Sequence, residues 1–179
     1  MSVFSVPAGS VAARVVYRTR QGLAHLRPQR AGAVDAELAG WLSPAQLGLV
    51  ARLTAADRAH LLRAGRRAAT LSADPDLVLA ALLHDVGKAD ERTRVRLWQR
   101  VLVVLLGRVA PDLLARLARP SHRPWRRGFY LALAHPRLGA EMARASGASA
   151  RACWLIAHHH DASVTDPTLT LLRQIDEEA

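Results

Sequence analysis

A histidine and an aspartate stand next to each other at positions 84 and 85, directly after the apolar run Ala-Ala-Leu-Leu. This run follows Asp74-Pro75, a pair typical of a helix start, so both ionisable groups are expected in the last turn of a buried helix. A buried carboxylate without a partner costs several kcal/mol, and a divalent metal ion would satisfy it. Imidazole and carboxylate together suit Fe, Mn, Zn, Co or Ni.

A metal site at this position needs further ligands from other helices. The sequence contains several histidine and aspartate residues that could supply them: His60, His135, the run His158-His159-His160, and Asp176. They lie far apart along the chain, so only the fold can bring them together.

The order of these residues resembles the HD superfamily of metal-dependent phosphohydrolases. The matching residues are His60, then His84-Asp85 followed by Val-Gly-Lys88, and Asp176. His135 in the run His-Pro-Arg-Leu-Gly-Ala, and the run Ile-Ala-His-His-His-Asp from Ile156, are similar to the extended H-HD-H-H-D form, whose members bind two metal ions. The resemblance covers residues 54–178 and implies an all-α helical bundle with the metal site in a cleft between helices.

The resemblance also implies which residues bind metal. The first ion would use four residues, His60, His84, Asp85 and Asp176. Asp85 would bridge to a second ion held by His135 and by one histidine of the triplet. The cofactor is therefore expected to be one or two divalent transition-metal ions, Fe or Mn first, with Zn, Co, Ni or Mg as alternatives.

The histidine triplet allows two alignments. The spacing that the family shows after its aliphatic residue, here Ile156, favours His159 as the ligand and His160 as a group that contacts phosphate. A shift of one residue would make the pair His158 and His159 instead.

Catalytic roles are implied for Asp85, Lys88 and His160. Two cations that share the Asp85 carboxylate would lower the pKa of a bridging water and hold it in line with a phosphorus atom. Lys88, the only lysine, matches a position that contacts substrate phosphate or a neighbouring carboxylate. Protonation of the leaving group is assigned to a metal-bound water or to His160.

The expected activity is hydrolysis of a nucleotide or related phosphomonoester or diester. The chain reads Asp161-Ala-Ser-Val-Thr-Asp166 after the paired histidines, whereas cyclic di-GMP phosphodiesterases have a Gly-Tyr-Pro signature there. This difference argues against cyclic di-GMP as the substrate. The alternative function is an HD-scaffold module that binds nucleotide or nucleic acid with little catalysis.

The chain is strongly basic, with 25 Lys and Arg against 15 Asp and Glu, a net charge of +10, and arginine as 24 of the 25 basic residues. Such a charge favours an anionic partner, which could be a nucleotide, a nucleic acid or acidic lipid headgroups, although a solvated basic surface explains it equally well. Of these, a phosphate-containing small molecule is the expected partner. Residues 119–127 combine arginines with Trp125 and could bind nucleic acid, or could form a solvated loop.

The single cysteine, Cys153, lies in an apolar run and is expected to be buried, which is consistent with a reducing cytoplasm. The most apolar window, residues 97–106, falls short of the roughly 20 residues that span a bilayer. No secretory signal is recognised, so a cytoplasmic location is expected.

Only 4% of the residues are aromatic while 50% are hydrophobic, so Leu, Ala and Val must build the core, which favours an all-α fold of seven or more helices. Residues 1–42 are expected to form a basic arm with one helix over about 11–24, and residues 43–179 the catalytic domain. Helix starts are predicted at Ser43-Pro44, Thr54 and Asp74-Pro75, the last of these helices ending at Gly87. Further helices are expected over about 91–106, from Pro111 to before Pro120, and over 129–134, 136–146, 149–160 and 167–178, with a turn-rich segment over 121–128.

Overall fold

The computed structural model describes residues 31–179, and the regular secondary structure of this part is helical, with nine α-helices and one short 3-10 helix, η1. The first elements are α2 (Ala31–Trp41), α3 (Pro44–Val50), α4 (Ala55–Leu71), α5 (Pro75–Leu83) and η1 (Val86–Lys88). The others are α6 (Leu97–Val109), α7 (Pro111–Leu117), α8 (Pro124–Ala145), α9 (Ala150–His158) and α10 (Pro167–Glu178). The all-α fold is confirmed, whereas the helix predicted over residues 11–24 lies outside the described residues.

Several helices begin where the sequence predicts, because side chains satisfy their first amides. The Ser43 hydroxyl accepts from the Gln46 amide, and the Gln46 side chain accepts from the Ser43 amide, which completes a capping box. Three more caps are Thr54, Asp74 and Asp166. Proline follows Ser43, Asp74 and Asp166, at the helical position where an amide proton is not needed.

The helix predicted from residue 91 begins later, at Leu97, because the preceding residues form a tight turn. The Asp90 carboxylate accepts the backbone N–H groups of Arg92 and Thr93, both at 2.8 Å. The Val95 amide donates to the carbonyl of Lys88 at 2.9 Å. These local bonds hold the backbone out of a helical conformation until residue 97.

Two helices predicted over 129–134 and 136–146 form one helix, α8, which continues through Pro136. It begins at Pro124, so the turn predicted over 121–128 is wrong in its second half, and Trp125 lies on the helix. α5 ends at Leu83, four residues before Gly87, where the sequence predicted its end.

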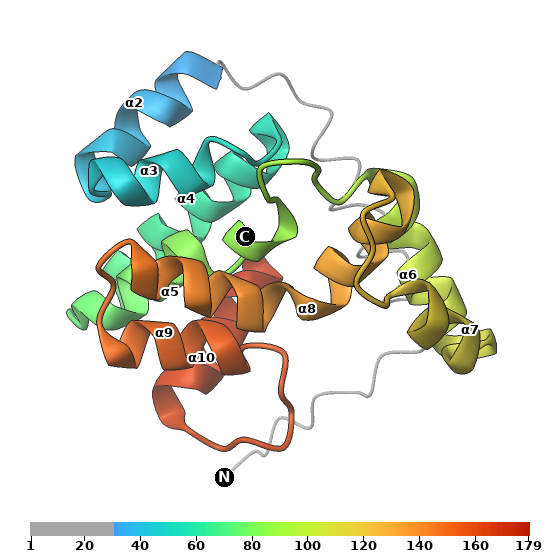
Figure 1. Cartoon of the computed structure of the whole chain (residues 1–179). Coiled ribbons are helices and arrows are strands. Elements are labelled where there is room, and N and C mark those ends of the chain that lie inside the picture. The colour runs from blue at the N-terminus through green and yellow to red at the C-terminus, as the bar shows by residue number, and fades with distance from the viewer. Residues whose placement is uncertain (1–30) are drawn as a thin grey trace, which may run out of the picture.

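The main hydrophobic core lies between α4, α5, α8, α9 and α10 (Figure 1). Leucine and alanine fill it, and Cys153 is buried in it, as predicted. α4 and α5 approach closely at Gly65, where a Cβ atom would lie 2.4 Å from Cδ2 of Leu82. This contact fixes the relative position of the two helices that carry His60 and His84.

Residues 31–41, grouped with the basic arm in the sequence, form α2 and pack against α4. Val34 and Leu38 are buried in the main core. The Arg58 guanidinium on α4 donates to the Asp35 carboxylate at 2.7 Å. α2 therefore contributes to the packed structure around the site.

α6 and α7 lie beside the beginning of α8, at the opposite end of the molecule from α2 and α3 (Figure 1). The Gln99 side chain on α6 donates to the carbonyl of Trp125 at 2.7 Å, and the rings of Trp98 and Phe129 meet edge to face. Among residues 31–179, no helix combines the length and apolar character that crossing a membrane requires.

Candidate metal centre

Three helices bring together the first group of candidate ligands. His60 lies on α4, His84 directly follows α5, and Asp176 lies in the last turn of α10. Nε2 of His60 is 3.3 Å from Nε2 of His84 and 3.0 Å from Oδ1 of Asp176, and the His84 and Asp176 atoms are 3.1 Å apart. Two imidazole nitrogens and one carboxylate oxygen thus form a small triangle of the atom types that bind divalent metals.

The Asp85 carboxylate links this group to a second one. Its Oδ1 atom lies 3.7 Å from Nε2 of His84 and 3.5 Å from Nε2 of His135. Its Oδ2 atom forms an ion pair with the Lys88 ammonium group. Asp85 is buried, so one carboxylate oxygen faces histidines from both groups without access to bulk water.

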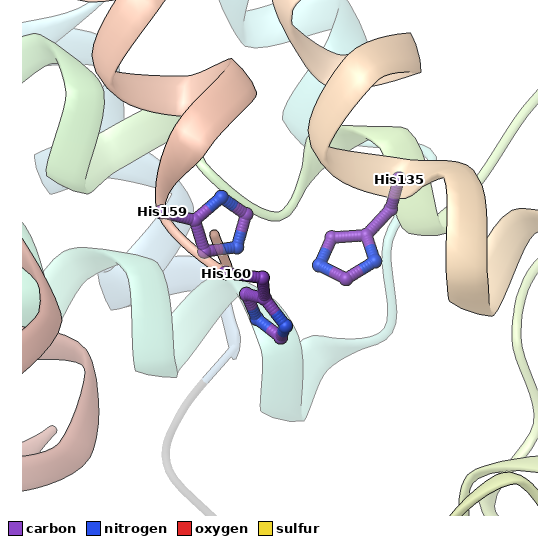
Figure 2. A group of neighbouring side chains, drawn as sticks. All are labelled: His135, His159 and His160. Atoms are coloured by element: carbon purple, nitrogen blue, oxygen red, sulfur yellow. The ribbon is translucent and has the colours of Figure 1, made fainter. Parts of the chain in front are cut away.

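The second group consists of His135 on α8 and of His159 and His160, which follow α9. Their imidazole rings turn toward a common space (Figure 2), and one ligand atom from each lies within 4.8 Å of the others. The ring centroids of His84 and His159 are 5.3 Å apart, so the two groups adjoin.

Backbone carbonyls fix the orientation of three of these histidines. The Nδ1 atoms of His84, His135 and His159 lie 3.0, 2.9 and 2.7 Å from the carbonyl oxygens of Ala81, Ala132 and Ile156, respectively. A ring that donates from Nδ1 leaves the lone pair of Nε2 free for a metal ion. The carbonyls of Ala81 and Ile156 are free to accept these bonds because they lie in the last turns of α5 and α9. Carbonyls in the last turn of a helix have no amide partner within the helix.

The surroundings of Asp85 and Asp176 favour the ionised form of both carboxylates, although Asp85 is buried and Asp176 is partly buried. Burial alone would raise the pKa of Asp85, but the Lys88 ammonium and the nearby His84 hold it well below its usual value. Burial opposes ionisation of Asp176 as well, yet His84 and a hydrogen bond from His60 lower its pKa. The site therefore presents negative charge to a cation.

The pKa values of the buried histidines differ between the two groups. Burial would lower the pKa of His84, but the Asp85 and Asp176 carboxylates raise it to about 9. Burial lowers the pKa of His135 well below its usual value, and burial with the nearby His84 lowers that of His159 to about 3. These low pKa values favour the neutral form of His135 and His159, which is the form that binds metal. The raised pKa of His84 favours its protonated form, so a cation bound there would displace this proton.

Three buried atoms at the junction of the groups have no hydrogen-bond partner: Asp85 Oδ1, His135 Nε2 and His159 Nε2. Leaving such an atom unpaired costs about 1–3 kcal/mol, so each needs an explanation. All three offer lone pairs of the kind that coordinates divalent cations. The residues present therefore fit a metal ion.

A family model described as HD domain matches residues 58–179. The chain belongs to the HD domain family. HD domains form a superfamily of metal-dependent phosphohydrolases and bind divalent metals, which agrees with the two groups of ligands. Among curated proteins and solved structures, no significant match is found.

The HD domain brings together all the residues that the sequence assigned to the site. They are His60, His84, Asp85, Lys88, His135, His159, His160 and Asp176. Lys88 contacts a carboxylate, which is one of the two contacts expected for it. His160 lies among candidate ligands of the HD domain, whereas the sequence assigned it to phosphate contact or proton transfer.

His158, the first histidine of the triplet, is held away from the HD-domain ligands. Nδ1 of His158 lies 2.8 Å from the carbonyl oxygen of Trp154, and its ring stacks on the Trp154 indole with centroids 4.7 Å apart. Of the two alignments of the triplet, the one that uses His159 and His160 is therefore the one that agrees with the geometry.

Arg173 on α10 also shapes the HD-domain site, although it is absent from the residues predicted from the sequence. Its guanidinium donates to the carbonyls of His158, His159 and Val164, each at 3.1 Å, and also to that of Asp161. These bonds hold the segment that carries His159 and His160. Nothing in the sequence distinguishes this arginine from the other 23.

Proposed function

We propose that the protein hydrolyses a phosphoester bond of a nucleotide or a related compound, using two divalent metal ions held by the two ligand groups. The observation that carries the proposal is the position of Asp85, whose unpartnered Oδ1 atom faces His84 of the first group and His135 of the second. A carboxylate in this position can bridge two cations. Membership of the HD domain family supports phosphoester hydrolysis as the reaction.

We assign two sets of ligands that share one residue. The first ion would be held by His60, His84, Asp85 and Asp176, and the second by Asp85, His135, His159 and His160. The mixture of imidazole and carboxylate suits Fe or Mn, with Zn, Co, Ni or Mg as alternatives. Such ions, when bound, lower the pKa of a water molecule and neutralise the phosphoryl oxygens.

The surrounding residues would bind and orient the substrate. The Lys88 side chain is 20% exposed while its ammonium group pairs with Asp85, so it can also donate to a phosphate oxygen that enters the site. The ring of His160 is the exposed member of the second group, so it lies where a substrate first meets the site. Buried Asp85, His84 and His135 would hold their positions during the reaction, because packing and backbone hydrogen bonds fix them.

A comparison of Asp85→Asn with His158→Ala tests this proposal. Asp85→Asn keeps the shape of the side chain but removes the charge that would bridge the ions, whereas His158→Ala removes a neighbouring histidine that Trp154 holds away from the ligands. The metal content per chain is measured by plasma mass spectrometry after anaerobic purification. Turnover is measured with p-nitrophenyl phosphate, bis(p-nitrophenyl) phosphate, mononucleotides, dinucleoside polyphosphates and cyclic dinucleotides.

We expect two metal ions per chain and turnover of at least one of these compounds by the unaltered protein and by His158→Ala. Asp85→Asn should lose at least one ion and about 100-fold or more in turnover. Full activity in Asp85→Asn would contradict the proposal. If no metal binds on reconstitution and nucleotides bind with a steep salt dependence but without turnover, the alternative of a nucleotide-binding module is correct instead.

A further inference from the structure

Most of the exposed side chains of α6 are apolar. Five of its side chains are 43% to 70% exposed: Leu97, Trp98, Val101, Leu105 and Val109. Four of them, at positions 97, 101, 105 and 109, follow one another at intervals of four residues, and Trp98 lies one position from the first. Residues four apart lie on the same side of a helix, so these side chains form one continuous stripe, here called the α6 face.

Toward the protein interior, α6 carries polar side chains as well as the partly buried Leu102, Val103 and Leu106. Gln99 is buried and donates to the Trp125 carbonyl, and Arg100 forms an ion pair with the buried Asp57 at 2.8 Å. Polar bonds therefore help to fix α6 against the rest of the molecule, while much of its leucine and valine surface stays exposed. An exposed apolar stripe of this kind on a folded protein indicates a surface that contacts another protein or a membrane.

The segment that surrounds the α6 face is strongly basic. Residues 92–127 contain a single acidic residue, Asp112, against ten arginines, which gives a formal charge of +9. Two of these arginines, Arg100 and Arg127, form ion pairs with Asp57 and Asp90 on other parts of the chain. Exposed arginines flank both ends of the helix, with Arg94 and Arg96 before it and Arg108 in its last turn.

This charge decides between the partners that an apolar face could have. A second copy of the chain would bring the same ten arginines against the first set, and the repulsion would oppose pairing. Residues 1–30 contain five arginines and no acidic residue, so they are repelled for the same reason. A nucleic acid would neutralise the arginines but would gain nothing from leucine and valine at the centre of the surface.

We propose that the α6 face docks this protein on the surface of a membrane that contains anionic lipids. Apolar side chains on one face of a helix and arginines at its edges match the boundary between acyl chains and negatively charged headgroups. Trp98, on this face, is of the residue type that prefers this boundary. With 13 residues, α6 is about 20 Å long, shorter than a bilayer core of about 30 Å, so it lies along the surface rather than across it.

Flotation of the full-length protein with lipid vesicles tests this proposal. One set of vesicles contains phosphatidylcholine alone, and the other contains about one third phosphatidylglycerol. Leu105→Ser removes an exposed leucine from the α6 face, and Leu71→Ser removes one of similar exposure from the end of α4 as a matched control. Both variants should have melting temperatures close to that of the unaltered protein and to each other, because both side chains are about half exposed.

The unaltered protein and Leu71→Ser should float with the anionic vesicles and only weakly with the neutral ones. Leu105→Ser should lower binding to the anionic vesicles about tenfold, and the pair Val101→Ser with Leu105→Ser further still. Equal binding of Leu105→Ser and the unaltered protein would mean adsorption through charge alone and would overturn the proposal. So would absence of binding, or a dimer in sedimentation velocity that Leu105→Ser converts to a monomer, since the face would then join two copies.

Discussion

Nδ1 of His135 donates to the carbonyl oxygen of Ala132, 2.9 Å away, in the interior of α8. In an unbroken helix this carbonyl would accept from the amide of residue 136. That residue is Pro136, which has no amide proton, so the carbonyl is free to orient the imidazole. The proline therefore prepares a candidate metal ligand without ending the helix.

Pro136→Ala should weaken the site while strengthening the helix. The new amide at position 136 would compete with His135 for the Ala132 carbonyl, and we expect metal affinity of the second group to fall about tenfold. Stability should rise, because proline in a helix interior is up to about 3 kcal/mol less favourable than alanine. Calorimetric metal titration and urea unfolding measure both effects, with Pro111→Ala at the start of α7 as the control. Unchanged metal affinity in Pro136→Ala would contradict this explanation.

Arg173→Ala should release the segment that carries His159 and His160. The lost guanidinium bonds to four carbonyls predict a decrease of about 2–3 kcal/mol in the free energy of unfolding. Metal content should fall from two ions per chain to one, because the first group does not depend on this segment. Arg173→Lys should recover only part of the effect, since a single ammonium group cannot span the four acceptors. Two ions bound to Arg173→Ala would refute this role.

Gly87→Ala should disrupt the contact between η1 and α8 that places Asp85 beside His135. A Cβ atom at Gly87 would lie 2.2 Å from the His135 carbonyl oxygen and 2.7 Å from the Gly139 amide nitrogen. Both are backbone atoms that cannot rotate away, so we expect a loss of about 2 kcal/mol or more in stability, together with weaker metal binding.

Gly107→Ala is the matched control for this substitution. At Gly107, on α6, the nearest atom to a new Cβ would be Leu114 Cδ2 at 3.7 Å, an ordinary contact. Because alanine is more favourable than glycine inside a helix, Gly107→Ala should be more stable than the unaltered protein by about 0.5–1 kcal/mol. Equal melting temperatures for Gly87→Ala and Gly107→Ala would show that the close approach is not required.

Local signals in the sequence were sufficient for the fold class and for the helices that begin at a cap followed by proline. Ser43-Pro44, Asp74-Pro75 and Asp166-Pro167 all start helices, because side-chain caps act within three residues. The predicted start of α6 was too early, because the turn at Asp90 and the backbone bond between Lys88 and Val95 compete with the helix. Two helices were predicted where the structure has the single helix α8. The helix continues through Pro136 because the side chain of His135 binds the carbonyl of Ala132, which the proline leaves without an amide partner.

The ligand set could be listed from residue types and order, but its geometry could not. That Asp85 faces both groups depends on how η1 packs on α8, and this contact involves residues about 50 positions apart. The hydrogen bonds of Arg173 go to backbone carbonyls, which leave no pattern in the sequence. The choice between His158 and His160 depended on Trp154, whose indole holds His158.

The ion pair between Asp57 and Arg100 should hold the α6 end of the molecule against α4. Nη2 of Arg100 lies 2.8 and 2.9 Å from the two carboxylate oxygens of Asp57, which is buried in the first turn of α4. Asp57→Asn leaves the partly exposed Arg100 guanidinium without its counter-charge, so we expect a loss of about 2 kcal/mol in the free energy of unfolding. Hydrogen exchange over α6 and α7 should accelerate, while metal content stays unchanged because neither residue is a candidate ligand.

A double-mutant cycle separates this pair from simple loss of packing. Arg100→Met keeps the aliphatic stem and removes the charge. It should destabilise the protein because it leaves the buried Asp57 carboxylate without a counter-charge, although the Thr54 hydroxyl still donates to it. If the two groups interact directly, Asp57→Asn combined with Arg100→Met should lose at least about 1 kcal/mol less than the sum of the single variants. Additive losses would show that the two side chains contribute independently. The α6 end would then be held by the Gln99 bond to Trp125 and the packing of Trp98 on Phe129.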